Sequence, residues 1–259
     1  MSAARTAIDV AASLEHRLAE LDRSEIRRRY LEADELVFIE DFLPADLLEH
    51  CLLELDTVLP HVHRNFIPRH KKGGAVGFDT LSHLAPTIRD LYLDAGFIEF
   101  VREICGEGVD PCPGSDLHRC ALYCYTEPGD HIGYHYDNSY YLDRRYTVLL
   151  GLRDESSCKL ACRLHTRNDG VEPVEFELAT PPGSLVIFNG DKVQHAVTPL
   201  GQGEARHVIT MQYVTDAGMH PFLRFVSDMK DAIAYFGFRK VFSRERPPAG
   251  PAPDQAVRD

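Results

Sequence analysis

Apolar residues recur at helical spacing over the first part of the chain. Residues 5–33 place leucine and isoleucine among Glu and Arg, which predicts one or two amphipathic helices that form a buttress or a homodimer surface. Residues 35–42 are apolar and β-branched, which predicts a strand, and residues 43–59 follow as a helix. The helical pattern returns over residues 83–105 and stops at Gly106. This part of the chain is therefore predicted to be mainly helical.

From residue 117 onward, short apolar runs alternate with turn signals, which is typical of an antiparallel sandwich or barrel. The eight predicted strands span residues 121–125, 131–137, 146–152, 159–165, 174–178, 185–188, 196–199 and 208–214. Residues 222–238 predict a last amphipathic helix, and the Pro- and Gly-rich tail over 244–259 predicts disorder. We expect a mainly β protein with flanking helices.

The predicted domain organisation has three parts. Residues 1–34 are an N-terminal helical extension, residues 35–240 are one domain with its β core at about 117–216, and residues 241–259 are a flexible tail. No apolar run approaches the roughly 20 residues of a membrane span, and the N-terminus has no signal-peptide pattern. We therefore expect a cytoplasmic protein that does not bind a membrane.

The charge of the chain excludes one class of partner and draws attention to one segment. The formal net charge of −12 argues against nucleic acid as a partner, because nucleic acid needs a positive surface. Residues 60–79 nevertheless gather cations and carry a Gly-Gly pair. This segment is either a solvated loop or a lid whose cations meet an anionic group of the substrate, and Arg64 and Arg69 are the candidate contacts. The chain also has 7 cysteines, which we interpret as small buried hydrophobic residues in a reducing compartment.

Three residues form a pattern typical of a metal site. His135 and Asp137 stand two apart in a predicted strand, so their side chains should project from one face. His195 follows the apolar strand Gly-Ser-Leu-Val-Ile-Phe. Two histidines and one carboxylate on one side of a metal leave its other side open, which is the facial triad of non-haem Fe(II) oxygenases. The alternative is an exposed His–Asp pair on a sheet edge, with His195 in a turn.

Arg206 begins the last predicted strand and could serve a co-substrate. If the metal uses a 2-oxo acid, the keto and near carboxylate oxygens chelate it, and the far carboxylate needs a partner within the barrel. A guanidinium presents two donors in a rigid fork suited to a carboxylate, so Arg206 is the candidate. The alternative is a surface pair with Glu204. Tyr125 could donate its hydroxyl to the same molecule, or it could serve only strand packing.

The His-x-Asp pair, His195 within His-Ala-Val-Thr-Pro and the later Arg206 together resemble the Fe(II)/2-oxoglutarate-dependent oxygenases over residues 35–216. The resemblance implies a double-stranded β-helix (jelly-roll) core with the N-terminal helices packed on one sheet. It implies Fe(II), 2-oxoglutarate as co-substrate and O2. It also implies that 2-oxoglutarate is decarboxylated to succinate and CO2 while an unactivated C–H bond of a small-molecule substrate is hydroxylated.

Within that superfamily, residues 128–138 and 162–166 are similar to the carrier-independent amino-acid hydroxylases and halogenases. The halogenases have Gly in place of the carboxylate ligand, so Asp137 implies a hydroxylase. The resemblance implies that His131 and Asn138 line the substrate cavity. The chain departs from the pattern at residues 156–160, and it offers Asp116 and His118 where an acid is expected.

Four tyrosines lie near the motif, namely Tyr134, Tyr136, Tyr140 and Tyr141. We expect them to exclude water from the metal centre, and Tyr134 is a candidate to stack on the substrate. Two other functions remain open. A protein hydroxylase of the prolyl or asparaginyl type would need an open groove beside the metal. A non-catalytic barrel that binds a metal or ligand would not turn over 2-oxoglutarate.

Overall fold

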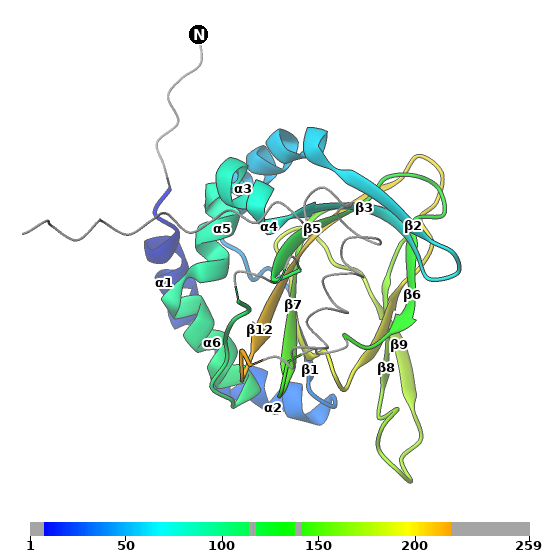
Figure 1. Ribbon diagram of the computed structural model, residues 1–259. Helices are drawn as coiled ribbons and strands as arrows, with labels where there is room; N and C mark the ends of the chain where they lie inside the picture. The colour runs from blue at the N-terminus through cyan, green and yellow to red at the C-terminus, as the bar shows by residue number, and fades with distance from the viewer. Residues whose placement is uncertain (1–7, 114–115, 117, 138–140, 219–259) are drawn as a thin grey trace, which may run out of the picture.

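One curled antiparallel sheet forms most of the molecule in the computed structural model, which describes residues 8–113, 116, 118–137 and 141–218 (Figure 1). The strand order is β1-β10-β7-β12-β5-β3-β6-β11-β8-β9, while β2 pairs with β3 and β4 pairs with β12. The strands are β1 (Leu36–Ile39), β2 (His63–Ile67), β3 (Lys71–Gly77), β4 (Asp110–Pro111), β5 (Cys120–Tyr125), β6 (His131–His135), β7 (Arg145–Glu155), β8 (Leu160–Leu164), β9 (Val174–Leu178), β10 (Leu185–Asn189), β11 (Gln194–Val197) and β12 (Ala205–Val214).

Helices cover the outer face of the half of the sheet that contains β5, β7 and β12 (Figure 1). They are α1 (Val10–Glu20), α2 (Arg23–Glu32), α3 (Ala45–Val58), the short η1 (Leu59–His61), α4 (Phe78–Leu84), α5 (Pro86–Leu93) and α6 (Ala95–Cys105). The α6 helix begins at Asp94, whose carboxylate accepts a hydrogen bond from the Phe97 N–H at 2.8 Å, and it ends at Gly106 with φ of 73°. The predicted end at Gly106 is confirmed, because glycine adopts this left-handed conformation without strain.

Alternation along β12 separates the helix-covered core from the inside of the curl. Ile209, Met211 and Tyr213 pack in the large apolar core with the helices. Because successive strand residues point to opposite faces, Arg206 and Gln212 lie on the inner face. This alternation allows polar chemistry inside the curl without disturbing the apolar core. The expected fold, mainly β with flanking helices and a jelly-roll core, is confirmed.

The segment over residues 60–79 is not a loop. It forms η1 and the antiparallel hairpin β2–β3, in which His63 pairs with Ala75 and Ile67 with Lys71. The β3 strand also pairs with β5 and β6, so the hairpin is part of the barrel wall. Charged residues and the Gly-Gly pair conceal this strand in the sequence, because its side chains are not an apolar run.

Several other predictions need adjustment or fall outside the described residues. The strand predicted to reach Asp137 ends at His135. The helical pattern over 83–105 contains parts of three helices and not one. The predicted helix at 222–238 and the tail at 244–259 lie outside the described residues. Within the residues described, no helix is long and apolar enough to cross a membrane. The domain bounds stay a prediction.

Candidate metal centre

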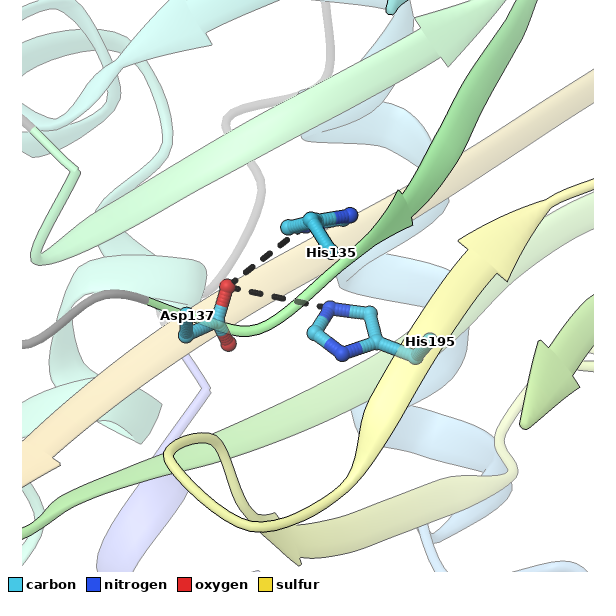
Figure 2. A group of neighbouring side chains, drawn as sticks. All are labelled: His135, Asp137 and His195. Carbon is cyan, nitrogen blue, oxygen red and sulfur yellow. Dashed lines mark ion pairs between the residues drawn. The ribbon is translucent and has the colours of Figure 1, made fainter. Parts of the chain in front are cut away.

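Two neighbouring strands and one loop bring His135, Asp137 and His195 together (Figure 2). His135 ends β6 and pairs with His195 of β11, and their ring centres are 4.2 Å apart. Asp137 lies two residues beyond β6, and its N–H donates to the Gly190 carbonyl at 2.9 Å. Its Oδ1 is 3.7 Å from Nε2 of each histidine. One ligand atom from each residue lies within 4.8 Å of the other two, which is the arrangement a single cation requires.

The other ring nitrogens fix which atoms face the centre. Nδ1 of His135 lies 2.9 Å from the Gly133 carbonyl, and Nδ1 of His195 lies 3.2 Å from the Val193 carbonyl. Because carbonyl oxygens only accept, each Nδ1 carries the proton and each Nε2 presents a lone pair. Two lone pairs and a carboxylate therefore converge on one point. The residues fit a divalent cation. Its positive charge would offset the electrostatic repulsion among the two nitrogen lone pairs and the carboxylate.

The electrostatics favour the protonation states that a metal needs. Burial, followed by the neighbouring His195, lowers the pKa of His135 to about 4, so this imidazole is neutral at physiological pH. Burial alone would raise the pKa of Asp137, but His195, His135 and Arg145 together lower it below its usual range. Neutral imidazole and ionised carboxylate are the forms that bind metal ions.

Arg206 lies inside the curl beside an apolar cluster. It is 1% exposed and pairs in register with Tyr125, and its guanidinium carbon is 5.3 Å from the Tyr125 ring centre. Its Nε donates to the Thr180 hydroxyl at 3.1 Å. Glu204 instead accepts hydrogen bonds from Ser157 and Gly201, so the alternative of a surface Arg206–Glu204 pair is wrong. The roles of Arg206 and Tyr125 toward a co-substrate stay predictions.

Three residues predicted as substrate contacts have other neighbours or are exposed in the structure. Arg64 is engaged elsewhere, because its two terminal nitrogens each donate to Asp130 at 2.7 Å. Arg69 is exposed in the β2–β3 turn with φ of 64°. Tyr134 is adjacent to His135 in the strand and so faces the opposite side of the sheet, where the Arg163 guanidinium lies 3.8 Å from its ring centre. The roles of these three residues as substrate contacts stay predictions.

The other residues predicted near the metal centre are one histidine, one asparagine and three tyrosines, and those that the structure describes have different surroundings. His131 pairs with Lys72 of β3, and its Nδ1 lies 2.8 Å from the Gly129 carbonyl; a register irregularity between Ile132 and His135 prevents alternation from placing it on the face of His135. Asn138 and Tyr140 lie outside the described residues. Tyr136 stacks with Arg167 and donates to Thr166, whereas the Tyr141 hydroxyl donates to Asp116 at 2.7 Å.

Two further residues lie near the centre: Lys71, which the sequence offered only as one of the cations of residues 60–79, and Thr147, which was not assigned a role. Lys71 of β3 is 1% exposed, and its Nζ is 4.4 Å from the Tyr123 ring centre. The Thr147 hydroxyl of β7 donates to Oδ2 of Asp137. A strand assignment for β3 would have revealed the inward position of Lys71, because alternation places it on the same face as Gly73 and Ala75. No sequence signal marks Thr147, because its contact depends on where the loop beyond β6 folds.

Comparison with known proteins agrees with this geometry. Residues 120–213 match the 2OG-Fe(II) oxygenase superfamily, and this range includes all three metal-centre residues and Arg206. No curated protein shows a significant sequence match to the chain.

Solved structures share the fold at low sequence identity. The non-haem α-ketoglutarate-dependent epimerase SnoN from nogalamycin biosynthesis is 14% identical with a TM-score of 0.61, and the match covers 78% of this chain and 86% of that one. A Pseudomonas putida prolyl-4-hydroxylase is 22% identical with a TM-score of 0.54, covering 74% and 97%. A Trichoplax adhaerens prolyl hydroxylase in complex with a hypoxia-inducible-factor peptide is 15% identical with a TM-score of 0.60, covering 83% and 95%.

The superfamily match over residues 120–213, from β5 into β12, and the His-Asp-His geometry agree, so this part of the chain is similar to the core of a 2OG-Fe(II) oxygenase. These findings support a 2-oxoglutarate-dependent oxygenase, and the matched superfamily uses Fe(II), 2-oxoglutarate and O2. The finer likeness to amino-acid hydroxylases stays a prediction.

Proposed function

We propose that the protein hydroxylates an unactivated C–H bond of a small molecule that carries a carboxylate, such as a free amino acid, with decarboxylation of 2-oxoglutarate to succinate. The observation that carries the substrate class is the buried, inward-facing Lys71. The oxygenase chemistry itself rests on the triad and on the superfamily match.

His135, Asp137 and His195 would hold Fe(II) through two Nε2 atoms and one carboxylate oxygen. When bound, the iron supplies the oxidative chemistry with O2 and the 2-oxo acid. Because the three ligands come from two adjoining segments on one side, the other side of the ion is left for the co-substrate and O2. The protein's own task is then to orient both organic molecules and to exclude water.

The co-substrate would lie between the metal and Arg206. A buried guanidinium is suited to hold the far carboxylate of 2-oxoglutarate, because it can donate two hydrogen bonds in one plane. Tyr125, its register partner, is 3% exposed and would add its hydroxyl. Val197 and Leu200 pack with Tyr125 in one apolar cluster, which suits the methylene groups of the co-substrate.

Lys71 supports an anionic primary substrate. It is on β3, which runs between β5, the strand of Tyr125, and β6, the strand of His135. The adjacent His70 ring lies 5.7 Å from the ring of His135, so this end of β3 adjoins the metal centre. An ammonium group in the barrel wall, at low dielectric, attracts a carboxylate more strongly than one in water.

The deciding experiment incubates the protein with Fe(II), 2-oxoglutarate and a panel of amino acids and related carboxylates. Succinate is measured by NMR, and each panel member is examined by mass spectrometry for the gain of one oxygen atom. We expect at least one member to stimulate succinate formation and to gain oxygen. Absence of succinate under every condition would favour the non-catalytic barrel and overturn the proposal.

Lys71→Met tests the substrate class, with Lys72→Met as the matched control. Lys72 is one-third exposed and donates to the Pro128 carbonyl at 2.9 Å, outside the barrel. We expect Lys71→Met to remove most of the stimulation while unstimulated 2-oxoglutarate turnover persists, and Lys72→Met to leave both unchanged. Full stimulation in Lys71→Met would contradict a carboxylate contact at this residue.

A protein hydroxylase is the second candidate, and one observation favours it. Among the described strands, β2 pairs only with β3, and its Phe66 is 66% exposed. An extended peptide could add to this free edge. Proline-containing peptides tested in the same assay would separate the two functions, because hydroxylated peptide without any turnover of small carboxylates favours this candidate. A cytoplasmic location and a homodimer stay predictions.

A further inference from the structure

The two oxygens of the Asp137 carboxylate have different neighbours. Oδ1 lies 3.7 Å from Nε2 of each histidine and is the oxygen that faces the metal centre (Figure 2). Oδ2 instead accepts a hydrogen bond from the Thr147 hydroxyl of β7. A carboxylate beyond the end of a strand would otherwise be free to rotate and to offer either oxygen, or both, to a cation.

Thr147 is itself held by a buried polar pair. Its Oγ1 lies 3.0 Å from Oε1 of Gln212, its register partner on β12, and this oxygen accepts a hydrogen bond from Nε of Arg145 at 2.9 Å. A hydroxyl has a single proton, and the charged carboxylate is a stronger acceptor than an amide oxygen that already binds a guanidinium. The Thr147 proton is therefore directed to Asp137.

Arg145 anchors the far end of this chain of contacts. Its Nη2 is 3.6 Å from Oδ2 of Asp116, and its backbone N–H donates to Asp191 at 2.9 Å. Thr147, Gln212 and Arg145 are 1%, 4% and 7% exposed, so water does not compete for their contacts. Packing and hydrogen bonds together leave Thr147 little freedom to rotate away from Asp137.

The backbone at Gly190 brings the two residues within reach. Asp137 is tied to the Gly190 carbonyl through its N–H, and the Gly190 N–H donates to the Arg145 carbonyl at 2.9 Å. A Cβ at position 190 would lie 3.0 Å from Oδ2 of Asp137 and 3.1 Å from Oγ1 of Thr147. The absence of a side chain at this position thus leaves room for the Thr147–Asp137 hydrogen bond.

We propose that Thr147, supported by Gln212 and Arg145, is a positioning residue that holds Asp137 so that only Oδ1 is presented to the metal. This inference rests on the metal-ligand roles within the proposed function and adds a residue that acts through a ligand. By holding Oδ2 away, Thr147 limits Asp137 to one coordination position and keeps the remaining positions available to 2-oxoglutarate and O2. Hydrogen-bonded partners of ligands commonly tune a metal site in this way.

The test compares Thr147→Val, which keeps the shape and loses the hydroxyl, with Thr147→Ser, which keeps the hydroxyl. Thr87→Val is the matched control, because Thr87 is also buried but lies on α5. Co(II) is titrated into the metal-free protein without oxygen, and the dissociation constant and the visible d–d spectrum are recorded. Thermal unfolding of the metal-free variants measures any purely structural effect.

We expect Thr147→Val to weaken Co(II) binding by about 10–100-fold and to change the d–d spectrum. Thr147→Ser should restore most of the affinity and the wild-type spectrum, and Thr87→Val should match wild type in both. Gln212→Met, which removes the support and keeps the hydroxyl, should weaken binding by a smaller factor. Agreement among these variants would establish Thr147 as a positioning residue.

Wild-type affinity and spectrum in Thr147→Val, with only its thermal stability reduced, would overturn the inference and leave Thr147 as a structural residue. If Thr147→Val does not fold, the Gln212→Met titration decides, and unchanged binding there contradicts the supporting role. The proposed function is tested by a different result. If wild-type protein binds Co(II) but forms no succinate with Fe(II), the proposed hydroxylation is wrong, while the positioning role of Thr147 is unaffected.

Discussion

Arg206 and Tyr125 are direct partners in the register of β12 and β5, and the Arg206 guanidinium carbon is 5.3 Å from the centre of the Tyr125 ring. This pair lies inside the curl, next to the apolar cluster that contains Tyr125. We therefore predict that Arg206→Met raises the KM for 2-oxoglutarate by about 10–100-fold, because a charged hydrogen-bond partner contributes roughly 1.5–3 kcal/mol. Succinate formation at increasing 2-oxoglutarate concentrations measures this.

Arg206→Met should leave Co(II) affinity unchanged, because Arg206 is not a ligand. Tyr125→Phe, which loses one neutral hydrogen bond, should raise the same KM by a smaller factor. An unchanged KM in Arg206→Met would show that another group holds the far carboxylate.

Gly190→Ala should weaken metal binding. The added Cβ would lie 2.8 Å from Cβ of Asp137, which is closer than such atoms approach in proteins, so Asp137 must move away from His135 and His195. We expect a loss of Co(II) affinity of at least tenfold, measured by titration. Gly108→Ala is the control, because a Cβ there meets nothing within 4 Å. Equal affinities in the two variants would show that the loop tolerates the methyl group.

The buried His207 should make the free energy of unfolding depend on pH. It is 3% exposed, and burial, followed by the nearby Arg153, lowers its pKa to about 4. The unfolded chain binds a proton near pH 6.5 and the folded chain only near pH 4. Between these values the unfolded state therefore holds more protons, so the free energy of unfolding falls as the pH is lowered, by up to roughly 3 kcal/mol.

Urea unfolding of the metal-free protein at pH 7.5 and at pH 5 measures this effect. His207→Leu should reduce the loss of stability at the lower pH, because the imidazole that must be kept neutral is gone. His61→Leu, at an exposed position, should retain the wild-type loss. If His207→Leu loses as much stability as wild type at pH 5, the pH dependence of the free energy of unfolding arises from other groups.

Arg64→Met should lower the free energy of unfolding and leave catalysis unchanged. Asp130 is fully buried, and it accepts both terminal nitrogens of Arg64 together with the N–H groups of Thr126 and Glu127. Removing Arg64 leaves the buried carboxylate with only the Lys72 ammonium at 3.7 Å as a cationic partner, at a cost of about 2–3 kcal/mol because Arg64 is itself partly exposed. Urea unfolding measures the cost. A large rise in the KM of the primary substrate, with unchanged stability, would support Arg64 as a substrate contact.

Local patterns predicted β6 to within two residues of its end, whereas the strand predicted at residues 196–199 begins two residues later than β11 and omits His195. The His-x-Asp spacing and the apolar strand before His195 located the metal centre, but β6 ends at His135, so Asp137 reaches the centre from the following loop and not by strand alternation. The superfamily match over residues 120–213 agrees with the resemblance that these residues carry. Alternation next to His135 indicates that Tyr134 faces the other side of the sheet, where Arg163 lies over its ring, and its role as a substrate contact stays a prediction.

Other features depend on contacts between distant segments. The β2–β3 hairpin was hidden because Lys71, Lys72, Gly73 and Gly74 do not form an apolar run, and only pairing with β5 and β6 makes them a strand. The Thr147–Asp137 hydrogen bond requires the loop after β6 to fold against Gly190. Neither arrangement is encoded within a short window of sequence.

The His135–His195 pairing gives the metal a mechanical role as well. In the hydrogen-bonded order of the sheet, β11, β8 and β9 are joined to the rest through β6, which pairs with β3 at only two residue pairs. A cation held by β6, its following loop and β11 would tie these strands together, and Asp137, which accepts a hydrogen bond from Thr147 of β7, would connect them to the other half of the barrel. Loading the metal should therefore slow amide hydrogen exchange across β11 and β8, so iron content would govern how often this side of the barrel opens.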